Sequence, residues 1–195
     1  MSTGEPPFVL PHPRSKLILN YTDEPQEPGE EVLATYGAHS NDKLLVHYGF
    51  VCATNPDMPN QDDDIRLDQI LLPSSSDSVR SQLQDVGFLG GYALLPATNE
   101  LCFKTQVAVR AMLLSSNEWE YFVANGEDLA EDHTADVQNY VARLLREYRD
   151  DVCDMIAKVR ICDAPGEVNE IALLETRWRQ ILEAVDAYLL TCQKR

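Results

Sequence analysis

The stretch that decides the fold is GEEVLATYGAHSNDKLLVHYGF, which runs from Gly29 to Phe50. A strand-like run, Val32 to Tyr36, ends at a Tyr-Gly turn, and a helix is expected to begin at Ser40-Asn41-Asp42. Ser40 can cap that helix by accepting a hydrogen bond from a free backbone N–H, and Gly49 suits the left-handed position that ends a helix. Taken alone, this pattern predicts a strand, a turn and a short helix that ends at Gly49. Tyrosines next to glycines are more often core or turn residues than catalysts.

Four short elements in this stretch carry a resemblance to a known family. They stand in order without gaps: Gly29-Glu30-Glu31, Tyr36-Gly37, Ser40-Asn41-Asp42 and Tyr48-Gly49-Phe50. In this order they resemble the C-terminal end of the catalytic SET domain in protein methyltransferases related to the Rubisco large-subunit lysine methyltransferase. The resemblance implies an S-adenosylmethionine-dependent protein-lysine N-methyltransferase whose partner is a protein with a target lysine, or a histidine in some relatives.

The resemblance also implies roles for single residues. Tyr36 matches the catalytic tyrosine, whose hydroxyl points into the channel where the methyl group crosses. Tyr48, Gly49 and Phe50 match positions assigned to binding the cofactor S-adenosylmethionine: the tyrosine position lines the lysine channel or the cofactor side, the phenylalanine lies against the cofactor, and the glycine lets the backbone approach closely. A free lysine has a pKa of about 10.4, so such a site must favour the neutral amine. A phenol can orient the lone pair of that amine by hydrogen bonding.

The chain departs from the family pattern upstream of this stretch. A full SET domain carries a glycine motif and an Asn-His pair shortly before the Gly-Glu-Glu element. None of the four histidines here follows an asparagine: His12, His39, His47 and His133. We therefore expect less than half of the cofactor pocket, and expect the chain to be truncated and inactive alone, without saturable binding of S-adenosylmethionine.

Three readings of the function stay open. The chain is a fragment or truncated product of a longer methyltransferase, or a remnant that serves as a non-catalytic protein-binding helical module. The third reading is a plain helical scaffold with an accidental match.

The acidic composition narrows the class of partner. The chain carries 32 acidic against 16 basic residues, for a net charge of −16. This balance argues against a direct nucleic-acid partner, which calls for a basic surface. No segment approaches the ~20 apolar residues of a membrane span. The N-terminus, Met1 to Arg14, lacks the apolar core of a secretion signal, so we expect intracellular residence, in the nucleus or the cytoplasm.

No metal site is expected from the sequence. The five cysteines are widely spaced and form no CxxC pair, which indicates reduced thiols. The run Asp62-Asp63-Asp64 lacks the glycine and glutamate positions of a calcium loop, so a solvated linker is the expected reading. His39 and His47 lie close to the motif but have no third ligand spaced near them.

Three regions follow from these patterns. Residues 1–52 are expected to be the C-terminal portion of a SET domain, with strands at Lys16–Tyr21 and Val32–Tyr36. Residues 53–64 are expected to be a linker, and residues 65–195 a helical substrate-binding domain like the one that follows SET in this family. The expected fold class is mostly α with a small β part, that is, the end of a β-rich SET domain followed by an α-helical domain.

The pattern after the linker is mainly helical. The family resemblance implies a short strand at 65–67. The pattern itself predicts a helix at 77–86, a turn at Gly90-Gly91, a hairpin from 92–95 and 101–103, and helices at 106–114 and 118–124. Two long helices follow, with apolar stripes at three-to-four spacing, and the break at Pro165-Gly166 predicts that they pack as an antiparallel pair. Tyr148 and Trp178 are expected in the core.

Overall fold

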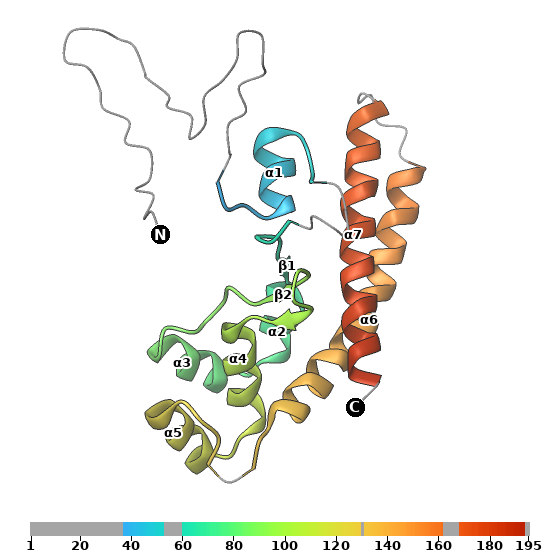
Figure 1. Ribbon diagram of the computed structural model, residues 1–195. Coiled ribbons are helices and arrows are strands. Elements are labelled where there is room, and N and C mark those ends of the chain that lie inside the picture. Colours follow the sequence, from blue (N-terminus) through green and yellow to red (C-terminus); the bar gives the residue numbers. More distant parts are fainter. Residues whose placement is uncertain (1–36, 53–59, 130, 162–167, 194–195) are drawn as a thin grey trace, which may run out of the picture. The chain divides into compact units, whose positions relative to one another are not determined.

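The computed structural model describes residues 37–52, 60–129, 131–161 and 168–193 (Figure 1). The described residues from Ala38 onward belong to one compact unit. In chain order, its elements are α1 (Asn41–Tyr48), β1 (Ile65–Arg66), α2 (Asp68–Ser74), α3 (Asp77–Asp85), β2 (Ala93–Leu95), β3 (Glu100–Leu101), α4 (Phe103–Leu113), α5 (Ser116–Asn125), α6 (Thr134–Arg160) and α7 (Val168–Gln193). The expected class, mostly α with a small β part, is confirmed. The strands expected at Lys16–Tyr21 and Val32–Tyr36 lie outside the described residues.

The two long helices α6 and α7 pack side by side and antiparallel, as the sequence predicts (Figure 1). Ion pairs join them at Arg160–Glu175 (2.8 Å) and Arg149–Asp186 (2.6 Å). The residue numbers therefore increase in opposite directions along the two helices. The apolar stripes are buried at most of their positions, with Tyr148 in the core and Trp178 half-buried. Leu174 is the most exposed position of the stripes, at 41%, because it borders a surface groove.

The short helices begin where small polar side chains can cap them. The Ser76 hydroxyl accepts from the Val79 N–H (3.3 Å) at the start of α3. At the start of α5, the Glu118 carboxylate accepts from the Ser115 N–H at 2.8 Å. The helices expected at 77–86, 106–114 and 118–124 are therefore confirmed, although α4 begins at Phe103 and takes the end of the expected hairpin strand.

The sequence patterns do not predict helix α2, which the structure contains at Asp68–Ser74. Pro73 stands in its last turn, and a proline is ordinarily a sign that a helix has ended. The helix forms because its apolar face is held in the core, where Leu71 and the preceding Leu67 are fully buried.

A small antiparallel sheet, ordered β1-β2-β3, links the helices. Leu94 is its centre, since it pairs with Ile65 on one side and with Leu101 on the other. The expected strand at 65–67 and the expected hairpin are thus confirmed. Asn99, in the hairpin turn at φ 56°, donates its amide N–H to Thr191 Oγ1 (2.6 Å) and thereby attaches the turn to α7.

One hydrophobic core runs beneath the sheet and between the helices. Its fully buried side chains come from nearly every element and include Ile65, Leu67, Leu71, Leu83, Tyr92, Leu94, Val109, Val141, Leu145, Val152 and Val185. Four cysteines of the described chain form no disulfide: Cys52, Cys102, Cys153 and Cys192. Within the described ranges, no helix is both long enough and apolar enough to cross a membrane.

Candidate functional site

Helix α1 carries the motif residues that the structure describes. It spans Asn41–Tyr48 and ends at Gly49, whose φ of 75° lies in the left-handed region and whose N–H donates to the Leu45 carbonyl (3.1 Å). The expected helix start and stop are therefore confirmed. A Cβ placed on Gly49 would meet no atom within 4 Å, so the backbone angle, not crowding, is what requires glycine here.

Three of the four predicted site residues, Tyr48, Gly49 and Phe50, lie at the end of α1. Tyr36 lies outside the described residues. Tyr48 is 44% exposed, and its ring stacks on His39 with centroids 6.1 Å apart. Phe50, next to Gly49, is half-buried. The assignment of Tyr48, Gly49 and Phe50 to a cofactor site stays a prediction.

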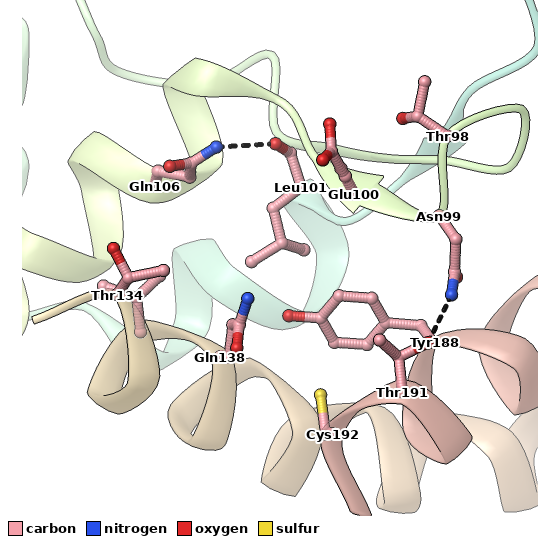
Figure 2. A pocket seen from close by; sticks show the side chains of 11 residues that line it. Thr98, Asn99, Glu100, Leu101, Gln106, Thr134, Gln138, Tyr188, Thr191 and Cys192 are labelled. Atoms are coloured by element: carbon pink, nitrogen blue, oxygen red, sulfur yellow. Dashed lines mark hydrogen bonds between the residues drawn. The ribbon is translucent and has the colours of Figure 1, made fainter. Parts of the chain in front are cut away.

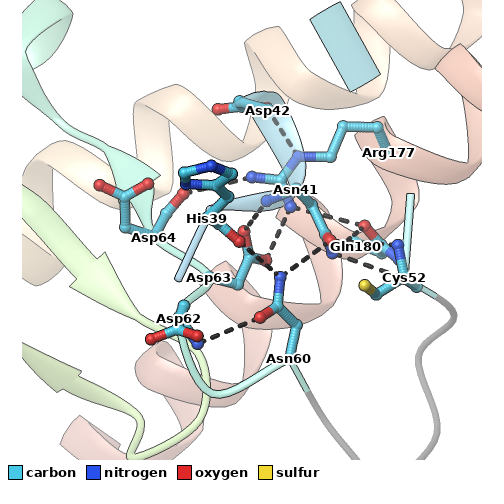
Figure 3. Close-up of polar contacts among 10 residues, drawn as sticks. All are labelled: His39, Asn41, Asp42, Cys52, Asn60, Asp62, Asp63, Asp64, Arg177 and Gln180. Carbon is cyan, nitrogen blue, oxygen red and sulfur yellow. Dashed lines mark hydrogen bonds and ion pairs between the residues drawn. The ribbon is translucent and has the colours of Figure 1, made fainter. Parts of the chain in front are cut away.

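The N-terminus of α1 is capped differently from the expectation. The Asn41 N–H donates to Asp63 Oδ1 at 2.9 Å, whereas the Ser40 side chain makes no capping bond (Figure 3). A carboxylate is a stronger acceptor than a hydroxyl, and its negative charge is stabilised at the N-terminus of a helix. The local capping expectation for Ser40 is wrong because a better acceptor arrives from 22 residues further along the chain.

The Asn41 side chain is buried and joins several segments (Figure 3). Its amide N–H donates to Gln180 Oε1 on α7 at 3.0 Å. Its carbonyl oxygen accepts from the Cys52 N–H (3.2 Å) and from the Asn60 amide (3.1 Å). Gln180 in turn donates to the Cys52 carbonyl at 2.8 Å. The start of α1, at Asn41, and the segment that follows α1, at Cys52, are thus both bound to Gln180 on α7.

Arg177 lies beneath this network and is only 2% exposed on its side chain. It donates from Nε to Asp42 Oδ1 (2.7 Å), from Nη1 to Asp63 Oδ2 (2.8 Å) and from Nη2 to the Asp64 carbonyl (3.2 Å). Burial alone would lower the pKa of Arg177, but the two carboxylates outweigh it and raise that pKa above its ordinary value. The guanidinium therefore stays charged, and it holds α1 and the segment at Asp63 on α7.

The expectation of a solvated aspartate run is wrong for Asp63, which is 7% exposed on its side chain. The polar composition of the run suggests a linker. The residue that buries Asp63, Arg177, is 114 positions away in the sequence, so the local pattern does not reveal it. The sequence of α7 does contain a signal that one buried carboxylate is needed. Arg177 stands between Leu174 and Trp178 on the apolar stripe, where a charged residue is expected to have a buried partner.

A surface groove of about 480 Å³ lies beside α1. Its apolar lining comes from α1, β1, α6 and α7 through Leu45, Val46, Ile65, Tyr148, Leu174, Trp178 and Ile181. Burial, with a smaller contribution from Asp42, raises the pKa of the Tyr148 hydroxyl, so it remains a neutral phenol. Tyr48, Gly49 and Phe50 are not among the lining residues, so this groove and the end of α1 are separate features.

A second cavity, of about 370 Å³, lies between the β2–β3 hairpin, α4, α6 and α7 (Figure 2). Its polar lining is mostly hydroxyls and amides, from Thr98, Asn99, Gln106, Thr134, Gln138 and Thr191, with Glu100 as its one carboxylate. Several of these groups already bond within the protein, as Gln106 does to the Leu101 carbonyl (2.9 Å). None of the predicted site residues lines this cavity. In the described part of the chain, no group of three or more His, Cys, Asp or Glu residues is placed to hold a metal ion.

Comparison with known proteins supports the coarser part of the expected resemblance, that to a lysine methyltransferase. Over 143 residues, the chain is 32% identical to the ribosomal lysine N-methyltransferase set11 of Schizosaccharomyces pombe. This chain is similar to part of a lysine methyltransferase. The match covers 71% of the chain but 34% of the yeast protein, so the chain corresponds to about a third of that relative. No family model matches the chain, and no solved structure matches it.

Proposed function

We propose that this chain is part of an S-adenosylmethionine-dependent protein-lysine N-methyltransferase of the SET class, in the group related to the Rubisco large-subunit methyltransferase. The observation that carries the proposal is the 32% identity to a lysine methyltransferase over 143 residues. The order of the motifs from Gly29 to Phe50 supports the finer assignment. The helical part would hold the protein that carries the target lysine.

The end of α1 fits one wall of a cofactor site. Tyr48 is half open to solvent, and the space around Gly49 is empty to 4 Å from a Cβ built there. The described residues offer an open face here and not an enclosed cavity. When bound, S-adenosylmethionine supplies an activated methyl group; Tyr48, Gly49 and Phe50 are the residues proposed to contact it. The network around Asn41 and Arg177 supports this role, because it fixes the position of α1 on α7.

Tyr36 is the proposed catalytic residue. A lysine must lose its proton before its nitrogen can act as a nucleophile, and a phenol nearby can accept or donate a hydrogen bond that fixes the direction of the lone pair. Orientation of this kind is a large part of the acceleration of a transfer reaction. Phenylalanine preserves the ring but removes that hydrogen bond, so Tyr36→Phe is the informative substitution.

We propose that the activity requires the remaining part of such an enzyme. The chain contains no Asn-His pair, and its match covers 34% of the relative. A chimera tests the assignment directly: this chain replaces the matched third of the yeast enzyme. Ribosomes from a yeast strain without that enzyme serve as substrate, because the relative's name specifies a ribosomal lysine. We expect transfer of labelled methyl to a lysine, measured by mass spectrometry.

The chimera carrying Tyr36→Phe should lose most of this activity, about a hundredfold in kcat. Tyr121→Phe, on α5, is the matched control and should keep it. A folded chimera without methyl transfer contradicts the proposed function, and an active Tyr36→Phe chimera contradicts the role of Tyr36.

A second function, a non-catalytic protein-binding module, is favoured by one observation. The residues from Ala38 onward form one compact unit, and its main hydrophobic cluster is built, among the described residues, from the sheet and helices α2 to α7. If this second function is right, residues 38–195 will co-sediment with ribosomes while the chimera remains inactive. A chimera that methylates ribosomes rules it out as the sole function.

A further inference from the structure

A groove between α3 and α5 is unrelated to the motif segment. Seven residues line it, and we call it the α3–α5 groove: Gln82, Asp85, Val86, Trp119, Glu120, Val123 and Ala124. It has a volume of about 280 Å³ and is open to solvent. Figure 1 shows α3 and α5 as neighbours, with α4 between them and α6.

The floor of the α3–α5 groove is apolar. Trp119 is 6% exposed, and its ring packs on Phe122 with centroids 6.1 Å apart. Val86 is half-buried beside it, whereas Val123 leaves 47% of its surface in water. An exposed valine over a buried tryptophan is a surface on which one aliphatic side chain of a partner can be desolvated.

The rim of the groove is acidic on both sides. Asp85 projects from α3 and Glu120 from α5, and both residues are exposed. In the described ranges, neither carboxylate forms an ion pair. Arg80, the basic residue of α3, is engaged elsewhere, since it donates to the Leu72 carbonyl at 2.6 Å and to Ser75 Oγ at 3.1 Å.

The chain around the groove offers few cations to balance this rim, since Arg80 is engaged as described and Arg110 lies over the Phe122 ring at 5.3 Å. From Ala111 to Ala142 the sequence contains no lysine or arginine. The same segment holds seven carboxylates: Glu118, Glu120, Glu127, Asp128, Glu131, Asp132 and Asp136. Among the described residues, only Asp128 of these seven has a guanidinium partner, Arg110, at 2.9 Å. The field over this face is therefore negative, and it attracts cations and repels phosphates.

We propose that the α3–α5 groove is a docking site for a basic segment of a partner protein. An aliphatic side chain of that segment covers Val86 and Val123, and a neighbouring lysine or arginine lies between Asp85 and Glu120. Charge complementarity selects this occupant over a nucleic acid, an acidic peptide or a wholly apolar one. The proposal does not depend on methyl transfer, so it can hold or fail whatever the proposed function does.

Fluorescence anisotropy with the full chain tests the proposal. The probe is a fluorescein-labelled amphipathic peptide of about twelve leucines and lysines, long enough for three helical turns. A second peptide has glutamate in place of every lysine. We expect micromolar binding of the lysine peptide, since a small interface supports modest affinity, and no binding of the glutamate peptide.

Two matched double variants locate the site. Asp85→Asn with Glu120→Gln removes the rim charges, and Glu147→Gln with Asp154→Asn removes two exposed charges from α6. We expect the first to weaken binding about tenfold and the second less than about twofold. Val123→Ser should weaken binding about fivefold through the apolar floor. Thermal unfolding followed by circular dichroism verifies that each variant is folded.

Three outcomes overturn the proposal. Equal weakening by both double variants shows diffuse attraction to an acidic protein, and no weakening by either places the peptide elsewhere. The third outcome comes from analytical sedimentation of the chain without peptide. A dimer that dissociates on the Asp85→Asn, Glu120→Gln change shows that the groove binds a second copy of this chain.

Discussion

At the scale of single residues, Asp63 has two tasks: it caps α1, which the sequence predicts for Ser40, and it pairs with Arg177, which the sequence does not predict. One carboxylate oxygen accepts from the first N–H of α1, and the other pairs with the buried guanidinium of Arg177. Asp42 and the Asp64 carbonyl complete the surroundings of that cation. A buried cation is tolerated only when it is paired and hydrogen-bonded, so the loss of one partner costs more than the bond itself.

Asp63→Asn should therefore be strongly destabilising. The substitution leaves Arg177 with one carboxylate in place of two and weakens the cap of α1. We expect a loss of about 3 kcal/mol in the free energy of unfolding, measured by urea denaturation at pH 7. Asp62→Asn is the matched control, because Asp62 is exposed and its side chain has no such contacts; it should change stability by less than about 0.5 kcal/mol. Equal effects of the two substitutions would show that the buried pair contributes nothing.

At the scale of elements, Asp128 joins the end of α4 to the start of α6. Arg110 donates to it from Nε and Nη2, both at 2.9 Å, and the His133 N–H donates at 3.1 Å. The hydrogen bonds from Arg110 lower the pKa of Asp128 below its ordinary value, against the opposing effect of burial, and the His133 N–H lowers it further. A folded-state pKa below the unfolded one means that the pair stabilises the fold in full above the unfolded pKa, about 3.9.

Asp128→Asn is expected to reveal this contribution by its pH dependence. At pH 7 the variant should be less stable than the parent by about 3 kcal/mol, because the side chains of Asp128 and Arg110 are buried. The difference should shrink as the pH falls below about 4 and through the lowered pKa of Asp128, where the parent also loses the charge. Urea denaturation at several pH values measures it, with Asp150→Asn on the exposed side of α6 as control. A difference that does not change between pH 7 and pH 3 would contradict the ionic origin.

Helix α1 is expected to behave as a part of the helical unit. Asn41 and Asp42 both bond to α7, through Gln180 and Arg177. A fragment of residues 65–195 would leave Arg177 buried without either carboxylate, whereas residues 38–195 keep the whole network. We expect the shorter fragment to be less stable by more than about 3 kcal/mol in urea, or not to fold. Equal stability of the two fragments would show that α1 is an independent attachment.

The sequence predicts most helices and the sheet, because local patterns decide them. The stripes of α6 and α7 and the stop glycine Gly49 at the end of α1 are short-range signals. Local patterns fail where a distant partner decides. Pro73 hides α2, whose face is fixed by the core, and Asp63 looks solvated until α7 brings Arg177 beside it. For the site, the sequence predicts the end of α1 correctly but not the network that fixes α1 in place.

At the scale of the whole molecule, the sequence similarity and the described site lead to one expectation about the cofactor. The end of α1 gives one open face, with Gly49 unobstructed and Tyr48 44% exposed. Tight binding of a charged cofactor requires that most of its surface be buried by the protein. Titration of S-adenosylmethionine into the purified chain by calorimetry should therefore show no saturable binding in the micromolar range. The chimera with the yeast enzyme, titrated in the same buffer, is the positive control. Saturable micromolar binding by the chain alone would mean that its own residues enclose the cofactor, and the proposed need for the remaining part of the enzyme would be wrong.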